Sequence, residues 1–163
     1  MEVLISKLTN YEVFINLFPG TLFYFFMKQI LKINIIEDSL FVLVFVCYFL
    51  GLVLSRIGSL IIEPFFRKIK KSAFRSHEKY IEAENKENNP KTSLKVYDEK
   101  NSIYRTLIAT FFVMSIFYII FSFYIINFNI FLFIVLFLLV ILFSFSYLKQ
   151  SNYISKRIDK LLN

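Results

Sequence analysis

Apolar residues in this chain fall into four long blocks separated by shorter polar stretches. The blocks cover residues 13–33, 39–62, 103–126 and 128–148. Each is about 20 residues or longer, and a helix that rises about 1.5 Å per residue then crosses a hydrocarbon core of roughly 30 Å. The pattern predicts an all-α integral membrane protein with four transmembrane helices, in which residues 1–163 form a single membrane domain.

Composition supports lipid as the solvent of these blocks. Hydrophobic residues make up 57% of the 163 residues, and 22 are Phe and 10 are Tyr. A soluble domain of this size has too little interior to bury so many apolar side chains. Membrane lipids are therefore expected partners of the protein.

The first block is interrupted by Pro19-Gly20. Pro19 removes a backbone donor and Gly20 loosens a helix, so this block reads either as a kinked span or as a re-entrant loop, with the kinked span preferred. Pro19 and Gly20 are a candidate hinge, although a static kink explains the same pair.

Basic residues predict the orientation. Residues 67–105 hold 11 of the 19 Lys and Arg residues, and four more lie in the C-terminal tail. The positive-inside rule then places both termini and the segment 67–102 in the cytoplasm, as in a multi-pass membrane protein. Helical extensions of the second and third spans, joined by a turn at residues 85–90, predict a short cytoplasmic helical hairpin between these spans.

A stripe of small residues marks the second block. On a helix with 100° per residue the stripe falls on one face, of the kind that lets transmembrane backbones approach closely, and it predicts a helix-packing or oligomer contact. Its members are Gly51, Ser55, Gly58 and Ser59.

Arg56 and Glu63 lie seven residues apart on the flank of this stripe. They form a candidate intramembrane polar site, pairing within or between subunits, and Glu12 of the first block is a further candidate partner for Arg56. A simpler interpretation is that Arg56 snorkels to the headgroups while Glu63 marks the helix end.

Tyr104 and Arg105 open the third block and are typical of an interfacial anchor at the cytoplasmic side. Alternatively they organise a cytoplasmic site together with the hairpin.

Catalytic motifs are not visible in the sequence. His77 is the only histidine, and a general base or a metal site needs partners that the pattern does not supply. With only three glycines, a phosphate-binding loop is also not indicated. We therefore expect no enzyme activity, no cofactor and no metal. The net charge of +7 is explained by topology, so no nucleic-acid partner is expected.

Four stretches of the sequence resemble a loose set of small multi-span bacterial membrane proteins. They are NYEVFINLFPG (10–20), GLVLSRIGSLIIEPFFRK (51–68), KYIEAE (79–84) and NSIYRT (101–106). These proteins look like membrane components of anti-phage defence systems, in which a short helical membrane protein acts as a sensor or as a membrane-damaging effector. The resemblance covers residues 10–110 and contains no motif diagnostic of chemistry.

Two classes of function follow. The first is an oligomeric membrane component of a bacterial defence system that perturbs the membrane, or forms a pore, when triggered. The alternative is a non-conducting sensor or scaffold that recruits a soluble cytoplasmic partner, and a small transporter or lipid-handling protein ranks lower. A homo-oligomer is expected in the first case.

Overall fold

The computed structural model of the protein describes residues 10–33, 39–87, 94–124 and 128–162, with the backbone alone for residues 10–14 and 124. Within these ranges the chain is mostly helical and contains no strand. The elements are α2 (Asn10–Gln29), α3 (Leu40–Ile57), the π-helical turn η1 (Gly58–Ile62), α4 (Glu63–Ile69), the short 3-10 turn η2 (Lys71–Ala73), α5 (His77–Asn85), α6 (Leu94–Tyr124) and α7 (Ile130–Leu162).

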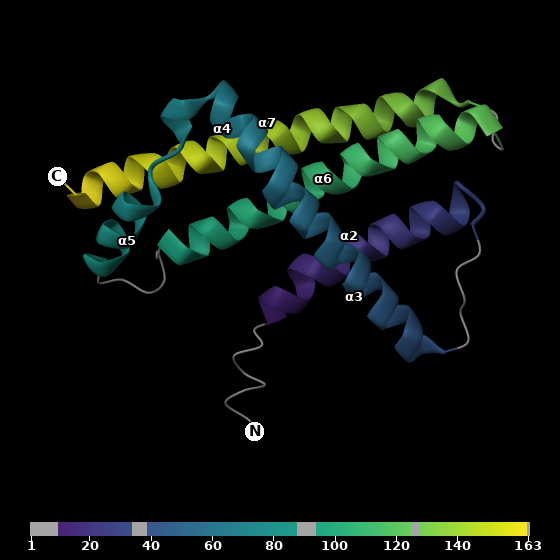
Figure 1. Ribbon diagram of the computed structural model, residues 1–163, viewed down its shortest axis with the longest axis horizontal. Helices are drawn as coiled ribbons and strands as arrows, with labels where there is room; N and C mark the ends of the chain where they lie inside the picture. The colour runs from purple at the N-terminus through teal and green to yellow at the C-terminus, as the bar shows by residue number, and fades with distance from the viewer. Residues whose placement is uncertain (1–9, 34–38, 88–93, 125–127, 163) are drawn as a thin grey trace.

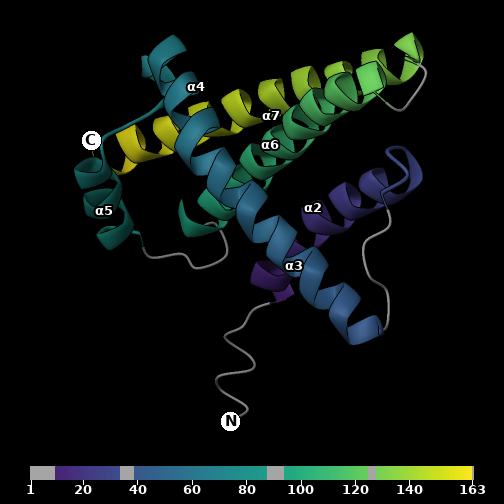
Figure 2. The same cartoon turned by 45° about the vertical axis from the view of Figure 1, so that its right-hand side comes forward.

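Two long helices, α6 and α7, pack side by side and antiparallel along the length of the molecule (Figures 1 and 2). Helix α3 crosses α2 and also contacts α6, and it continues through η1 into α4. The short helix α5 packs against the last turns of α7. The central element is therefore α6, which contacts α2, α3, η1 and α7.

Three helical stretches are long and apolar enough to cross a membrane. They are Leu40–Ile69, Leu94–Phe123 and Ile130–Leu162. Large apolar side chains on them are exposed, among them Phe41, Phe45 and Phe137. In lipid every backbone polar group must be bonded within the protein, and an α-helix meets this condition. The exposed apolar side chains of these helices are therefore expected to face the hydrocarbon.

The first predicted span is not among these three stretches. Residues 13–33 do form a helix in part, α2, which ends at Gln29. Its apolar run is interrupted by Asn16, Pro19, Gly20 and Thr21. The four-span architecture is accordingly not established by the described helices.

Close backbone contact joins α2 to α3. A Cβ atom added at Gly51 would lie 1.7 Å from the Asn16 carbonyl oxygen, and one added at Gly20 would lie 1.7 Å from the Cys47 carbonyl oxygen. Glycine is therefore required at both positions for the helices to cross this closely. Helix α2 passes through Pro19 as one element, and Gly20 sits at the crossing point.

Hydrogen bonds from Tyr118 fix the connection between α6 and α7. The Tyr118 hydroxyl donates to the Asn129 carbonyl oxygen at 3.2 Å and accepts from the Asn129 N–H at 2.7 Å. The Asn129 side chain then accepts from the N–H of Phe131 at 3.0 Å, which caps the start of α7. Three polar groups that would otherwise lack partners near the end of an apolar helix pair are thereby satisfied.

The predicted hairpin between the second and third spans is not confirmed. The helix that follows η1 ends at Ile69, because Lys70 adopts φ −132° and ψ 66°, outside the helical region. Helix α5 is thus separate from α4, and it ends at Asn85. Half of the turn expected at residues 85–90, residues 88–90, lies outside the described residues. Helix α6 does extend beyond the predicted span on its N-terminal side, as expected, and begins at Leu94 instead of residue 103.

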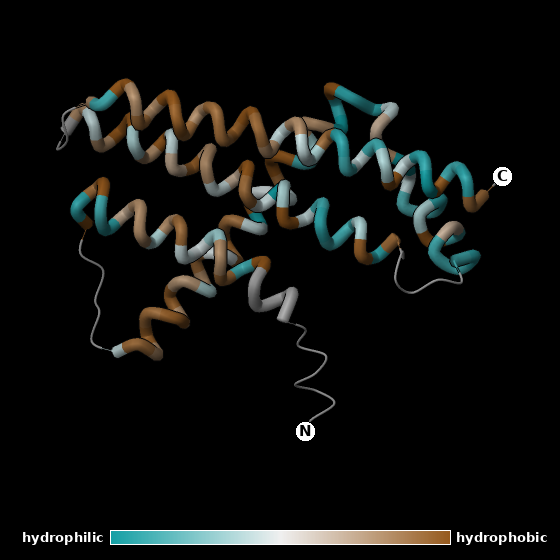
Figure 3. The backbone as a smooth tube through the Cα atoms, turned by 180° about the vertical axis from the view of Figure 1, so that it is seen from behind, coloured by the Kyte–Doolittle hydropathy of each residue, from teal (hydrophilic) through white to brown (hydrophobic). Residues whose placement is uncertain are grey.

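We call the polar end the part of the molecule made by α4, α5, the first turns of α6 and the last turns of α7, and it is hydrophilic in Figure 3. A small core of Ala83, Leu94, Ile154 and Ile158 holds it together. The buried carboxylate of Glu87 accepts from the Leu94 N–H at 2.6 Å and from Arg157 Nε at 2.8 Å. One acidic side chain therefore caps the start of α6 and ties it to α7.

Candidate functional site

The π-helical turn η1 sets the direction of Glu63. The Glu63 N–H donates to the Gly58 carbonyl oxygen, five residues back instead of four. Residues after such a turn are rotated about the helix axis relative to an uninterrupted α-helix, and π turns are frequent at functional sites. Glu63, the first residue of α4, consequently faces α6.

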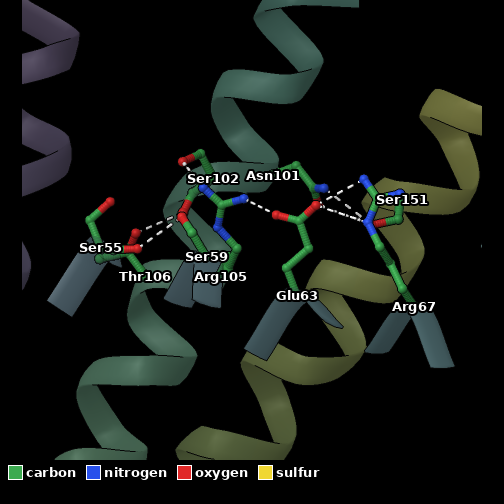
Figure 4. Close-up of polar contacts among 9 residues, drawn as sticks. All are labelled: Ser55, Ser59, Glu63, Arg67, Asn101, Ser102, Arg105, Thr106 and Ser151. Carbon is green, nitrogen blue, oxygen red and sulfur yellow. Dashed lines mark hydrogen bonds and ion pairs between the residues drawn. The ribbon is translucent and has the colours of Figure 1, made fainter. Parts of the chain in front are cut away.

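The Glu63 carboxylate bridges two arginines (Figure 4). One oxygen, Oε2, accepts from Arg105 Nη1 of α6, and the other, Oε1, accepts from Arg67 Nε at 2.9 Å. Arg105 also donates through Nη2 to Ser102 Oγ at 3.2 Å. The side chains of Arg105 and Glu63 are only 20% and 22% exposed, so this pair is better shielded from water than a surface ion pair.

Gly58 brings α6 close enough for this bridge. A Cβ atom at Gly58 would lie 3.2 Å from the Arg105 carbonyl oxygen and 3.3 Å from Arg105 Cγ, which is tighter than ordinary van der Waals contact. The glycine and the π turn therefore act together: one allows the approach, and the other turns the carboxylate toward it.

The bridge forms part of the wall of a partly open pocket of about 310 Å³ at the polar end. Its walls come from α4, the loop after it, α5, α6 and α7. The lining side chains that carry charge or a hydroxyl, amide or imidazole group are Glu63, Arg67, Arg75, His77, Tyr80, Asp98, Asn101, Ser102, Arg105, Tyr147, Ser151 and Ser155. A pocket of this size admits a small ligand, and its wall is unusually rich in polar groups.

Two contacts shape the walls of this pocket. Asn101 Nδ2 of α6 donates to Ser151 Oγ of α7 at 3.1 Å, and both side chains are buried. On the other side, Arg75 donates to both carboxylate oxygens of Asp159, at 2.8 and 2.6 Å, and this hydrogen bonding raises the pKa of Arg75 above its usual value.

Tyr80 is the phenol that α5 contributes to the pocket. Burial, followed by nearby carboxylates, raises its pKa well above the usual value. The phenol therefore stays neutral at physiological pH and can both donate and accept a hydrogen bond.

Arg56 lies away from this pocket. It is exposed on α3 and makes no ion pair with Glu63, which is occupied by Arg105 and Arg67. The expected shared flank of Arg56 and Glu63 assumed an unbroken α-helix, and the π turn between them removes that register. Glu12 belongs to α2, but its side chain lies outside the described residues.

The small-residue stripe is used within the chain. Gly51 contacts α2 at Asn16, and Gly58 contacts α6 at Arg105. Ser59 Oγ donates to the Ser55 carbonyl oxygen of its own helix at 3.1 Å. The two glycines are therefore covered by other helices of the same chain, and an additional contact with a second copy stays a prediction.

Tyr104 and Arg105 separate in the structure. The Tyr104 ring packs on Phe143 of α7 with ring centroids 6.4 Å apart, whereas Arg105 enters the pocket wall. Whether Tyr104 and Arg105 act as an interfacial anchor, or organise a cytoplasmic site together with the hairpin, stays a prediction.

Sequence reasoning missed the contribution of α7. Tyr147, Ser151 and Ser155 recur every four residues and line the pocket, but the fourth block was expected to end at residue 148. The usable signal was this spacing, together with the lack of Gly or Pro in residues 148–162, which lets the helix run on. Among the described residues, no group of three or more His, Cys, Asp or Glu side chains is placed to hold a metal ion.

The comparisons with known proteins add no relative: no family model matches the chain, and neither does any curated protein or solved structure. The class of the protein therefore rests on its own helices. Three stretches that can cross a membrane, with apolar surfaces exposed along them, indicate an all-helical membrane protein that carries a polar pocket at one end.

Replacing Glu63 by Gln tests the bridge. The amide cannot neutralise the shielded guanidinium of Arg105 or the half-exposed guanidinium of Arg67, and the two charges are left close together. We therefore expect the free energy of unfolding to fall by about 2 kcal/mol. The purified protein is unfolded in mixed micelles containing SDS. Unfolding is monitored by the labelling of Cys47, the one cysteine of the chain, which is buried in the folded protein.

Glu82→Gln is the matched control, because Glu82 pairs with Lys86 at the same i,i+4 spacing but on an exposed surface. Its free energy of unfolding should change by less than about 0.5 kcal/mol. Equal losses in the two variants would show that the Glu63 bridge contributes no more than a surface pair.

Proposed function

We propose that the protein is a non-enzymatic membrane sensor, whose pocket at the polar end takes up a small polar ligand. The observation that carries this proposal is the Glu63 bridge, which joins two membrane-crossing stretches in the wall of the pocket. A polar ligand in this pocket competes with Glu63 for the donors of Arg105 and Arg67. Ligand binding thereby weakens the Glu63–Arg105 ion pair between α4 and α6. A ligand that changes this contact shifts the population of two arrangements of the helices, and such a shift can carry a signal.

The proposal includes an orientation. The concentration of Lys and Arg in residues 67–105 and in the C-terminal tail supports a cytoplasmic position for the polar end. Both termini lie on that side if α2 also crosses the membrane, which completes a four-span protein of a bacterial inner membrane. The pocket is then open to the cytoplasm at the level of the inner headgroups.

Ligand retention tests the sensor. Protein extracted from membranes in a mild detergent is expected to carry a bound small molecule or lipid, detected by native mass spectrometry. Asp98→Trp places a bulky ring at the mouth of the pocket at an exposed position, so it should remove the added mass without disturbing the core.

Lys100→Trp is the control for the added ring, because Lys100 is exposed on the same helix and does not line the pocket. It should retain the ligand. The absence of any added mass in the wild type, or the same mass in Asp98→Trp, would contradict the sensor.

A membrane-perturbing assembly is the second candidate, in line with the resemblance to components of anti-phage defence. The specific observation is Arg56, which is exposed on α3 near exposed Leu52, Val53 and Leu60. A guanidinium on such an apolar surface is costly in lipid unless it reaches the headgroups or is covered by further copies of the chain.

Membrane potential, followed with a voltage-sensitive dye after induced expression in bacteria, separates the two candidates. An assembly that uses Arg56 depolarises the cells as the wild type and fails to do so as Arg56→Ala. A sensor leaves the potential unchanged in both cases. Equal depolarisation by the two proteins would remove Arg56 from the working part of any pore.

A further inference from the structure

Ser155 is an exception among the helical hydroxyl groups. Eight others each donate to the carbonyl oxygen four residues earlier in their own helix, a bond that satisfies a hydroxyl in apolar surroundings. They are Thr21, Ser59, Thr106, Thr110, Ser115, Ser122, Ser144 and Ser146. Ser155 is 2% exposed, lines the pocket, and its Oγ has no hydrogen-bond partner among the described residues.

Arg105, which also lines the pocket, carries a second polar atom without a described partner. Its Nη1 and Nη2 are bonded to Glu63 and Ser102, but its Nε is buried without a partner in the described part of the chain. A guanidinium N–H can only donate, and leaving a buried donor unpaired is costly. The missing partner is thus an acceptor, and an oxyanion suits a guanidinium best.

Charge in the pocket argues against a simple anion. Arg67 and Arg105 share Glu63, and Arg75 is paired with Asp159. Asp98 also lines the pocket, and it makes no hydrogen bond or ion pair with another described residue. A ligand that carried only negative charge would be repelled by this carboxylate, whereas a ligand with an added cation would pair with it.

Building on the proposed function, we infer that the pocket binds a zwitterion that joins a phosphate ester to an ammonium group. Arg105 and Ser155 bind the phosphate oxygens, and Asp98 binds the ammonium. The same chemistry occurs in the headgroup of phosphatidylethanolamine and in free phosphoethanolamine. The position of the pocket beside the ends of the membrane-crossing stretches allows either source.

Thermal unfolding of the full-length protein in detergent, read by a thiol-reactive dye on Cys47, tests this inference. The probes are phosphoethanolamine, inorganic phosphate and ethanolamine at equal concentrations. We expect phosphoethanolamine to raise the Tm, with a Kd from the titration about tenfold or more below that of either part alone, because both charges contribute. Short-chain phosphatidylethanolamine should bind more tightly still if the lipid is the source, and no better than the free headgroup if it is not.

Three variants assign the roles. Ser155→Ala should weaken phosphoethanolamine binding about tenfold, because one hydrogen bond to the phosphate is lost. Asp98→Asn should abolish the preference for phosphoethanolamine over inorganic phosphate. Ser144→Ala, which removes a hydroxyl from the same helix outside the pocket, should leave binding unchanged.

The outcomes separate this inference from the proposed function. If inorganic phosphate binds as tightly as phosphoethanolamine, or if Ser155→Ala and Asp98→Asn have no effect, the zwitterion assignment is overturned. If phosphoethanolamine does not bind but another molecule is retained by the wild type and lost from Asp98→Trp, the sensor stands with a different ligand. If nothing is retained by either protein, both proposals fail.

Discussion

The ion bridge from Glu63 to Arg105 and Arg67 is the interaction on which the arrangement of the polar end depends. It connects the stretch that follows α3 with α6 at Arg105, and both connected helices carry long apolar segments. Such a bridge requires close approach of the two backbones, which Gly58 permits, and a rotation of the chain, which the π turn η1 provides. The pocket beside it exists because these side chains turn toward one another and leave space that α5 and α7 only partly close.

Satisfaction of polar groups in apolar surroundings explains much of the remaining structure. Tyr118 and Asn129 close the hydrogen bonds where α6 and α7 meet, and Asn101 with Ser151 joins the same helices near the other end. Hydroxyl groups along the helices bond to their own backbone. Against this background, the Ser155 hydroxyl and Arg105 Nε stand out because both are buried without a partner among the described residues, and because both residues line the pocket. A buried polar group without a partner calls for a specific explanation, and the proposed ligand supplies one.

The sequence predicts the helices better than it predicts the site. Length and hydropathy are enough to find the three stretches that can cross a membrane, because a bilayer demands about 20 apolar residues whatever the helix packs against. The first block was harder to assign as a span, because Asn16, Pro19 and Gly20 interrupt its apolar run. Asn16 and Gly20 lie where α2 crosses α3. The small residues Gly51 and Gly58 were recognised as packing positions from their spacing alone, but the helices that cover them could not be known without the fold.

The partner of Glu63 could not be predicted for a specific physical reason. A helical wheel assumes a constant rotation per residue, and it placed Glu63 beside Arg56. The π turn between them changes that rotation, and no residue in the stretch GSLII predicts such a turn. The continuation of α7 to Leu162 was also missed, although Tyr147, Ser151 and Ser155 already show a spacing of four. In the first error a regular α-helix was assumed to continue through the end of an apolar block. In the second a helix was assumed to stop where the apolar block stops.

A double-mutant cycle between Glu63 and Arg105 tests the central interaction most directly. The free energies of unfolding would be measured for the wild type, Glu63→Gln, Arg105→Gln and the double variant in the same mixed micelles. If the bridge holds the polar end together, the two losses are not additive, and the coupling energy is about 1 kcal/mol or more. Additivity within about 0.5 kcal/mol would contradict the account, because it would mean that the two side chains do not interact in the folded protein.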